Sequence, residues 1–388
     1  MVERERSRRA VLKGGGALVA AGLLAGCQSG DGTTAETTTD ATTTTETTTE
    51  QTTTAEDTSY SVSMEPVGDV TFEEVPETWL PYTGDYADMG VALGQADGLA
   101  GIGVPSRYGT HHYAELDGVS VDKESLTTLY QDGTGKEVFY SVDADIHVID
   151  PNFMVNRLQW EQSDVDEIAN GVAPFFGNTI FTQVYDWHDY EYYSLYEAFE
   201  KLAEVFQERE RYEAFKTYHD EVVADVQSRI PEETPEIALL YPAGVPPESF
   251  YPYLIGEGTA SKQWRDLSVD DALAAAGVTD AQAGGATIDY ETLLDIDPDA
   301  IAVRLSGNIS EEYFQENIVA PMEEDEVASR LTAVQDGRVF YGGLTYQGPI
   351  IHLFQLETAA RGLFPDTFDA DEELFDRGRV SDIVNGEF

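Results

Sequence analysis

The chain has a single cysteine, Cys27, among its 388 residues, and it has few basic side chains: 22 lysines and arginines against 73 aspartates and glutamates. A lone cysteine excludes a disulfide within the chain. The formal net charge of −51 argues against binding to nucleic acid or to an acidic membrane surface. Long apolar runs are also missing, because segment 14–25 is little more than half of the roughly 20 residues that a membrane-spanning helix needs.

The first 26 residues have the composition of an export signal. Basic residues are concentrated in 4–13, small and apolar residues fill 14–25, and the run ends at Leu24-Ala25-Gly26-Cys27. Segment 7–13, Ser-Arg-Arg-Ala-Val-Leu-Lys, resembles the twin-arginine export signal. The leader with Cys27 resembles the lipoprotein signal of prokaryotes, which is cleaved before the cysteine. We therefore expect a twin-arginine lipoprotein signal over 1–26 and a lipid on Cys27; a signal anchor with an incidental cysteine is the alternative.

A threonine-rich segment follows the cysteine. Residues 33–54 contain fifteen threonines separated by Glu, Asp, Ala and Gln, without large apolar side chains. Such a composition cannot offset the entropy lost on folding, so we expect a disordered tether over 27–60. The tether is either a stalk, with its threonines open to O-glycosylation, or a simple spacer.

The excess of acid indicates where the protein works. Loss of the leader removes five basic and two acidic residues and leaves a net charge of −54. Such a surface repels itself at low ionic strength and is screened within about 3 Å at molar salt, which is typical of an extracellular protein from a high-salt habitat. The carboxylates are dispersed, and no Asp-x-Asp-x-Asp-Gly loop indicates calcium sites.

The remaining residues, from about 61 onward, are enough for two domains of ordinary size. Short apolar stretches bounded by turn residues alternate with helical patterns, which predicts an α/β fold with mostly parallel sheets. The expected strands are 99–104, 138–141, 145–149, 237–241, 300–305 and 339–341; the expected helices are 195–206, 267–276 and 350–362.

A long amphipathic run separates the two groups of strands. Within 208–230, Tyr212, Phe215, Val222, Val226 and Ile230 recur at three- or four-residue steps or their sum, and Pro231 ends the pattern. This spacing predicts one helix, about 35 Å long at 1.5 Å per residue. We expect it to bridge two Rossmann-like lobes, an N-terminal lobe over 61–207 and a C-terminal lobe over 231–388.

The order of these elements resembles the ABC-transporter substrate-binding lipoproteins of the ferrichrome/cobalamin type, the class III iron-siderophore group. The leader, the long helix after 195–202, segment 288–301 (Ile-Asp-Tyr-Glu-Thr-Leu-Leu-Asp-Ile-Asp-Pro-Asp-Ala-Ile) and segment 334–341 before a last helix carry the likeness, which covers roughly 66–368. The acidic composition makes it haloarchaeal-like. The family's usual turn after the first strand appears as Leu-Pro-Tyr-Thr-Gly-Asp over 80–85, so ligand contacts from that loop are not carried over.

The resemblance implies a receptor that captures an iron-siderophore between its lobes and delivers it to an ABC permease with its ATPase. It implies a monomer with no catalytic role, no cofactor of its own and a membrane attachment through the lipid on Cys27. Ligands of open α/β sheets bind outside the carboxyl ends of the strands, where this chain is unusually aromatic. The residues that we expect at the ligand are Arg107, Tyr108, Trp187, His188, Tyr190, Tyr241, Tyr251, Tyr253, Arg304 and Tyr346.

Each of these residues also has a structural interpretation. Trp187 and Tyr190 could pack within their loop, and Arg107 and Arg304 could form surface ion pairs in an acidic chain. If either arginine faces the ligand, its planar fork suits a carboxylate or an anionic chelate. His111 and His112 would point to opposite sides of a strand, so we do not expect both to ligate one metal.

Other functions remain open. Cobalamin is an alternative ligand, and a zinc or manganese receptor built on His111, His147 and His188 is another. A secreted hydrolase is a third possibility, although the chain has no His-Glu-x-x-His, Gly-x-Ser-x-Gly or Gly-x-x-x-x-Gly-Lys motif. A surface structural protein would also explain the leader and the stalk.

Overall fold

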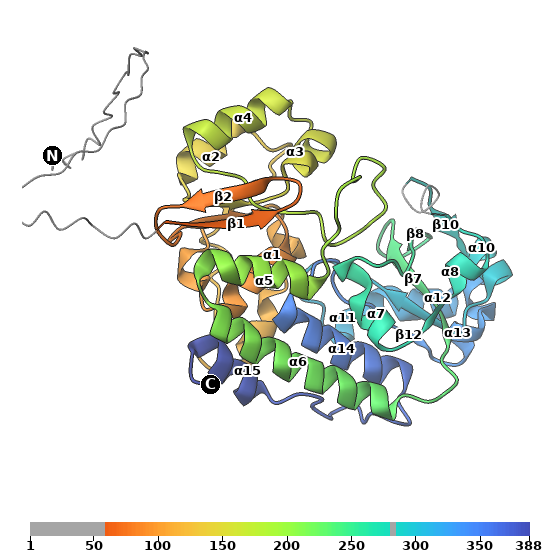
Figure 1. The fold of residues 1–388 in the computed structure, drawn as a ribbon. Helices are drawn as coiled ribbons and strands as arrows, with labels where there is room; N and C mark the ends of the chain where they lie inside the picture. The colour runs from red at the N-terminus through yellow and green to blue at the C-terminus, as the bar shows by residue number, and fades with distance from the viewer. Residues whose placement is uncertain (1–58, 280–284) are drawn as a thin grey trace, which may run out of the picture. The chain divides into compact units, whose positions relative to one another are not determined.

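The computed structural model describes residues 59–279 and 285–388 (Figure 1). The predicted signal, Cys27 and almost all of the predicted tether lie outside the described residues. Within the described ranges, no helix combines the length and the apolar character needed to cross a membrane.

A β-hairpin begins the described chain. Strands β1 (Tyr60–Met64) and β2 (Gly68–Phe72) pair antiparallel, with Val62 opposite Val70. Val62, Met64, Val70 and Phe72 are buried while their neighbours are more exposed. This alternation is the period of two expected of strands with one face on the core.

Short parallel strands follow. β3 (Trp79–Pro81) pairs with β6 (Ile146–Val148), β4 (Gly101–Ile102) pairs with β5 (Thr127–Thr128), and a bridge from Trp79 to Leu99 links the two pairs. The strands predicted near 99–104 and 145–149 are thus present, although shorter. The strand predicted over 138–141 is wrong, because these residues belong to helix α2 (Lys136–Val142), where Phe139 alone is buried. Four apolar residues are too few to distinguish a period of two from one of 3.6.

Four more helices complete this part: α1 (Gly84–Ala92), α3 (Pro151–Leu158), α4 (Gln162–Gly171) and α5 (Leu195–Phe206). Helix α5 has the predicted limits. It begins with a capping box in which the Ser194 side chain accepts from the Glu197 amide and the Glu197 carboxylate accepts from the Ser194 amide.

The predicted long helix is present as α6 (Arg209–Arg229). Its buried residues are Tyr212, Phe215, His219, Val222 and Val226, so the predicted apolar stripe faces the interior and also contains one histidine. Ile230 takes an extended conformation and ends the helix, as expected for a residue that precedes a proline.

The six-stranded sheet has the strand order β10-β8-β7-β11-β12, and β9 also pairs with β7. β7 (Glu236–Pro242), β11 (Ala300–Val303) and β12 (Val339–Tyr341) run parallel, whereas β8 (Ser249–Tyr253) is antiparallel to β7. Two further strands of this sheet are only two residues long: β9 (Asp270–Asp271) and β10 (Ile288–Asp289). Residues 300–303 are all buried, as expected of a central strand covered on both faces.

The remaining helices lie around this sheet and at the C-terminus (Figure 1): α7 (Lys262–Asp266), α8 (Ala272–Ala275), α10 (Tyr290–Ile296), α11 (Glu311–Phe314), α12 (Ala320–Glu324), α13 (Thr332–Gln335), α14 (Pro349–Leu363) and α15 (Arg377–Asn385). Of the helix predicted over 267–276, only the second half forms, as α8. The last predicted helix is present as α14. The α/β class with mostly parallel sheets is confirmed.

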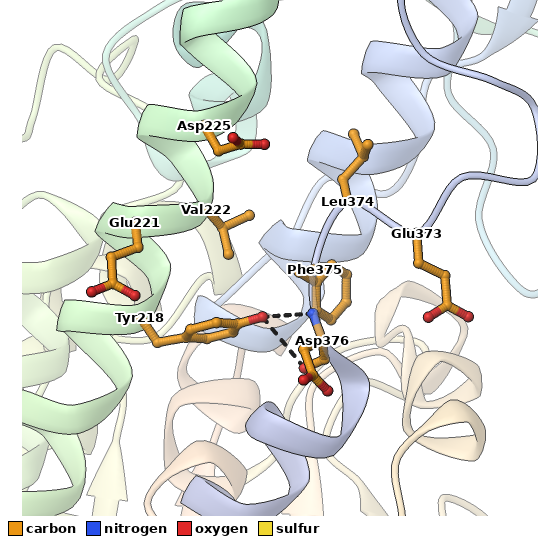
Figure 2. A pocket seen from close by; sticks show the side chains of 8 residues that line it. All are labelled: Tyr218, Glu221, Val222, Asp225, Glu373, Leu374, Phe375 and Asp376. Atoms are coloured by element: carbon orange, nitrogen blue, oxygen red, sulfur yellow. Dashed lines mark hydrogen bonds between the residues drawn. The ribbon is translucent and has the colours of Figure 1, made fainter.

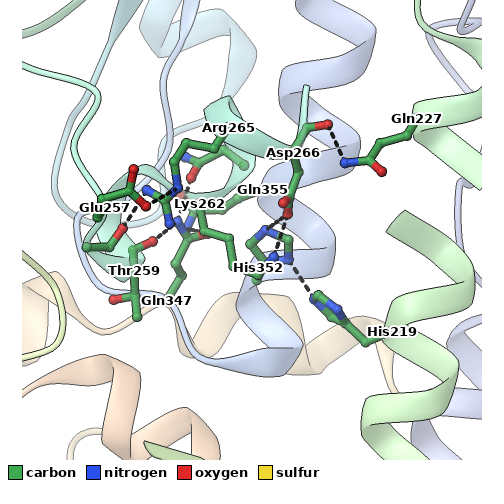
Figure 3. Close-up of polar contacts among 12 residues, drawn as sticks. His219, Gln227, Glu257, Thr259, Lys262, Arg265, Asp266, Gln347, His352 and Gln355 are labelled. Carbon is green, nitrogen blue, oxygen red and sulfur yellow. Dashed lines mark hydrogen bonds and ion pairs between the residues drawn. The ribbon is translucent and has the colours of Figure 1, made fainter. Parts of the chain in front are cut away.

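A buried polar junction joins α6, α7 and α14 (Figure 3). His219 Nε2 lies 2.8 Å from His352 Nδ1, and His352 Nε2 lies 3.0 Å from Asp266 Oδ2. Lys262 Nζ lies 2.7 Å from the same Asp266 oxygen. Both histidines are buried, so this chain of polar groups fixes the three helices in one arrangement.

The start of α14 is held by a side chain from α1. Asp88 Oδ2 accepts hydrogen bonds from the backbone amides of Ile350 and Ile351, each at 2.9 Å. Its other oxygen accepts from the Tyr113 hydroxyl at 2.6 Å. A carboxylate at this position satisfies two of the amides that a helix leaves unpaired at its first turn.

Candidate functional site

The candidate site lies where loops that follow strands of the two sheets meet. The amides of Thr259 and Ala260 donate to the carbonyls of Ile180 and Phe181, at 2.9 and 3.2 Å. A Cβ at Gly258 would stand 2.2 Å from the Phe181 carbonyl oxygen, so only glycine permits this close approach of the two backbones. Residues that are far apart in the sequence are thereby brought to one place.

Aromatic side chains fill the junction, and we define the aromatic cluster as Tyr82, Phe153, Phe181, Tyr185, Trp187 and Tyr346. Ring centroids are 5.4 Å apart for Tyr82 and Phe153, 6.0 Å for Phe153 and Phe181, and 5.1 Å for Phe181 and Tyr346. Phe181 also contacts Tyr185 at 6.2 Å, and Tyr185 stacks on Trp187 at 5.0 Å. The rings form one continuous path from Tyr82, directly after β3, to Tyr346, in the loop after β12.

Three arginines border the aromatic cluster. Arg157 lies 5.0 Å from the centre of the Tyr185 ring, which is a cation–π distance. Arg107, at the end of the 3-10 turn Pro105–Arg107, hydrogen-bonds Tyr346. Burial alone would lower the pKa of Arg107, but the interaction with Tyr346 raises it.

Arg304 directly follows β11 and is only 1% exposed. It donates to the carbonyl oxygen of Ala260 and lies 5.3 Å from the centre of the Tyr253 ring, while its Nε has no hydrogen-bond partner. Burial lowers the pKa of Arg304 to about 10, so the guanidinium still carries its charge at neutral pH.

Among the described residues, none of these three arginines forms an ion pair with a carboxylate. Six other arginines do: Arg209, Arg211, Arg229, Arg265, Arg361 and Arg377. In a chain with 73 acidic residues, three guanidinium groups without a carboxylate partner thus lie around one aromatic cluster, and the buried Asp85, 3.5 Å from the Thr259 hydroxyl, is the nearby acid. Such an arrangement suits an anion with apolar or aromatic parts.

Most of the predicted ligand residues lie at this junction. Arg107, Trp187, Arg304 and Tyr346 belong to it directly, and Tyr241 and Tyr253 lie near enough to raise the pKa of Arg107 further. The Tyr241 hydroxyl lies 3.4 Å from the Ser306 hydroxyl, so Tyr241 contacts the loop after β11 that begins with Arg304. Tyr251, on β8, is 43% exposed.

Tyr108 lies away from the aromatic cluster, whereas His188 and Tyr190 continue the stack that begins at Trp187. Tyr108 is buried, and its hydroxyl lies 2.9 Å from that of Tyr113, so it belongs to the core beneath Asp88. His188 is buried between Tyr190 and Tyr192, with ring centroids at 3.9 and 3.5 Å. His188 also stacks on Trp187, with ring centroids 5.8 Å apart, so His188 and Tyr190 extend the aromatic cluster along their loop.

Asp150 fixes that loop and was missed by the sequence analysis. Its side chain accepts from the Tyr190 hydroxyl at 2.6 Å, the Thr179 hydroxyl at 2.8 Å, the Thr179 amide at 2.9 Å and the Asn152 amide at 2.9 Å. Burial raises the pKa of Asp150, and these hydrogen bonds oppose the rise. An aspartate between a strand and a proline is the signal that could have identified it as a helix cap.

The histidines of the alternative metal-receptor hypothesis are dispersed. His147 is buried between Phe139 and Phe175, both with ring centroids at 5.0 Å, and His188 packs on tyrosines. Over the described ranges, no three His, Cys, Asp or Glu side chains are grouped so as to hold a metal ion. The expectation that His111 and His112 diverge is wrong, because they lie in the 3-10 turn Thr110–Glu115 with ring centroids 4.1 Å apart.

A cavity of about 470 Å³ lies apart from the aromatic cluster, between α6 and the segment before α15 (Figure 2). Its walls include the carboxylates Glu221, Asp225, Glu373 and Asp376, and the Tyr218 hydroxyl accepts from the Asp376 amide at 2.6 Å. No arginine lines it. This cavity is therefore lined by acidic groups, whereas the aromatic cluster is bordered by arginines.

Comparisons with known proteins identify the family. Residues 82–344 match the sequence profile of a family described as periplasmic binding protein. No curated protein sequence matches the chain.

Solved structures share the fold at low sequence identity. A periplasmic binding protein from Veillonella parvula is 18% identical, with a TM-score of 0.54, over 77% of this chain and 88% of its own. The iron uptake ABC transporter substrate-binding protein PiuA from Streptococcus pneumoniae is 14% identical, with a TM-score of 0.54, over 78% and 98%. The petrobactin-binding protein YclQ from Bacillus subtilis is 14% identical, with a TM-score of 0.51, over 76% and 94%.

Proposed function

The chain belongs to the periplasmic binding protein family, and from that membership we propose that it is the substrate-binding component of an ABC importer that captures a ferric siderophore. Two of the similar structures are named for iron uptake and for petrobactin binding, which supports this ligand class. The bound chelate is cargo, which the protein delivers at the extracellular face of the membrane to a permease that works with its ATPase.

The observation that carries the proposal is the position of the unpaired arginines Arg107, Arg157 and Arg304 around the aromatic cluster. A ferric chelate of catecholate or carboxylate type combines a negative charge with a flat or bulky organic rim. The guanidinium groups offer planar donors to its oxygens, and the rings offer stacking surface to its rim. The general negative potential of the chain would otherwise repel such a ligand.

Attachment and assembly are further parts of the proposal. Cys27 carries the lipid, the threonine-rich segment separates the folded body from the membrane, and the folded body acts as a monomer. Docking on the permease opens the site and releases the chelate.

The test is a fluorescence titration at molar salt. The protein has four tryptophans, of which Trp187 belongs to the aromatic cluster. We expect a ferric chelate to quench Trp187, and Arg107→Ala to lose one charge-assisted hydrogen bond worth about 1.5–3 kcal/mol, or roughly ten- to a hundredfold in affinity. Ferric hydroxamates, ferric catecholates, cobalamin, zinc and manganese are titrated in parallel.

The matched control is Arg330→Ala. Arg330, like Arg107, is exposed, ends a 3-10 turn and pairs with no carboxylate among the described residues, but its turn, Ala328–Arg330, packs on α10, α12 and α13. Its affinity should equal that of the wild type. Binding of cobalamin alone, or of free zinc or manganese alone, would replace the siderophore assignment with the corresponding receptor.

A further inference from the structure

Asn308 stands in the one Asn-x-Ser/Thr sequence of the chain. The sequence contains seven asparagines, and only Asn308-Ile309-Ser310 has a hydroxyl residue two positions later. The middle residue is isoleucine, and a proline there would prevent modification. This pattern is the acceptor sequence for N-linked glycans on proteins that leave the cytoplasm.

The structure separates Asn308 from the other six asparagines. Each of those six side chains has a hydrogen-bond partner within the protein: Asn152, Asn156, Asn170, Asn178, Asn317 and Asn385. The Asn308 amide has none among the described residues, and the side chain is exposed. The single acceptor sequence therefore coincides with the single asparagine whose Nδ2 is uncommitted.

The surroundings of Asn308 leave room for a bulky group. Asn308 lies in the loop between β11 and α11, after Gly307, which has a φ of +100°. A Cβ built at Gly307 would meet nothing within 4 Å. Ser310 is also exposed, and its hydroxyl accepts from the Tyr313 amide at 3.1 Å as the cap of α11. Both residues of the acceptor sequence are thus reachable in the folded protein, as they must be if the chain is exported already folded.

We propose that Asn308 is N-glycosylated by transfer of an oligosaccharide from a lipid-linked donor. In this step a bond forms between Asn308 Nδ2 and the anomeric carbon of the first sugar. The bond from that carbon to the phosphate oxygen of the lipid carrier breaks, its electron pair leaves with the phosphate, and the amide gives up one proton. The inference relies on the extracytoplasmic location contained in the proposed function.

The position of Asn308 places the glycan next to the candidate ligand site. It is four residues beyond Arg304 and two beyond Ser306, which contacts Tyr241. The oligosaccharide therefore stands at the rim of the candidate ligand site on the side of β11. It covers a loop that would otherwise be accessible to proteases.

The experiment is mass spectrometry of the full chain purified from its own host. After proteolysis, we expect the peptide that spans residue 308 to carry added sugar mass, and the intact mass of Asn308→Gln to be lower by that amount. Ser310→Ala should also lose the sugar, whereas Ser310→Thr should retain it because threonine keeps both the acceptor sequence and the helix cap. Asn317→Gln, which alters an asparagine outside any acceptor sequence, should keep the full mass.

A peptide spanning residue 308 that is wholly unmodified would overturn the proposal, and so would sugar confined to the threonine-rich segment. Chelate titration of the same preparation is independent of this result. A glycosylated protein that binds no chelate would leave the acceptor site established and refute only the ligand assignment.

Discussion

His219 Nε2 and His352 Nδ1 lie 2.8 Å apart in the buried junction of α6 and α14, and their partners determine where the protons are. His352 Nε2 lies 3.0 Å from Asp266 Oδ2 without the alignment of a hydrogen bond, and the attraction of the carboxylate favours a proton on this nitrogen, with Nδ1 as the acceptor. His219 must then donate from Nε2, which leaves His219 Nδ1 with a lone pair and no partner among the described residues. Both imidazoles are therefore held neutral in the folded protein.

The first prediction is that this junction destabilises the fold in mild acid. Burial lowers the pKa of His352 to about 4 and that of His219 well below its ordinary value, with Lys262 adding to both shifts. The unfolded chain binds these protons near pH 6.5, so the stability contributed by the two histidines is complete above pH 6.5 and declines from there toward pH 4. Urea unfolding at molar salt between pH 7.5 and 4.5 measures the slope.

His219→Gln isolates this contribution. Glutamine retains a donor for His352 Nδ1 but does not titrate, so the slope should fall by up to about 1.4 kcal/mol per pH unit relative to the wild type. Other groups around the junction are Lys216, Tyr196, Arg265 and Asp266, and they are unchanged in the variant. Parallel stability curves for wild type and variant would show that His219 takes no part in the pH response.

The second prediction concerns Asp88. Its carboxylate accepts from two backbone amides and one tyrosine hydroxyl, so Asp88→Ala leaves three buried donors unpaired and should lower the free energy of unfolding by about 2–5 kcal/mol. Asp88→Asn keeps one acceptor oxygen and should cost less. The exposed Asp97→Ala is the control, with an expected change within about 0.5 kcal/mol.

The contribution of Asp88 to stability changes with pH in the direction opposite to that of the histidines. Burial raises its pKa to about 7, so its contribution to stability is fully present below about pH 4 and is lost as the pH rises through 7. Asp88→Asn should remove this part of the profile and make stability flatter between pH 5 and 8. A profile that keeps the wild-type shape in Asp88→Asn would contradict the assignment.

The third prediction separates binding from folding at Arg304. Its guanidinium is buried without a carboxylate partner and with Nε unpaired, which is a cost to the free protein. Arg304→Met should therefore leave the melting temperature of the ligand-free protein unchanged or raise it, while chelate affinity falls roughly tenfold or more. A purely structural arginine would give the reverse, with lower stability and unchanged affinity.

The fourth prediction is a dependence of stability on salt. The net charge of −51 should make the melting temperature several degrees lower at about 0.1 M than at about 1 M potassium chloride, because the Debye length shrinks from about 10 Å to about 3 Å. Chloride is preferred to sulfate, which stabilises folded proteins by its exclusion from their surfaces. Coincident melts at the two concentrations would refute the expectation.

The fifth prediction concerns the anchor. Cys27 is the only thiol that could carry the lipid, so Cys27→Ser should leave the protein unprocessed or release it into the medium. Fractionation and intact mass of the product decide this. Membrane retention of a cleaved Cys27→Ser chain would disprove lipid attachment at this residue.

The sequence predicted best those elements whose pattern is long. Helix α6, with 21 residues, and α5, with its capping box, have almost the predicted limits because several turns of periodic burial define them. Segment 138–141 was assigned to a strand because its four residues carry no resolvable period, and the actual helix is fixed by burial of Phe139. Local pattern cannot supply such tertiary information.

For the site, strand ends could be located but side-chain directions could not. Arg107 and Arg304 were placed after strands correctly, yet nothing local distinguishes the exposed Arg107 from the buried Arg304. Arg157 was missed because it lies on helix α3, and only the fold brings it to Tyr185. Tyr108 was expected at the ligand because it lies in the loop after the predicted strand 99–104, but its hydroxyl lies 2.9 Å from that of Tyr113 in the core.

The capping of α14 by Asp88 has a kinetic consequence. Any motion that separates α1 from the start of α14 must uncover a buried carboxylate and the amides of Ile350 and Ile351 at the same time. At a net cost of about 1.5–3 kcal/mol for each of these two hydrogen bonds to a charged group, such an intermediate would be populated in fewer than one molecule in a hundred. Ligand exchange in solution should then be slow and governed by rearrangement of loops, and a partner that accelerates it must supply substitutes for these hydrogen bonds or leave them intact.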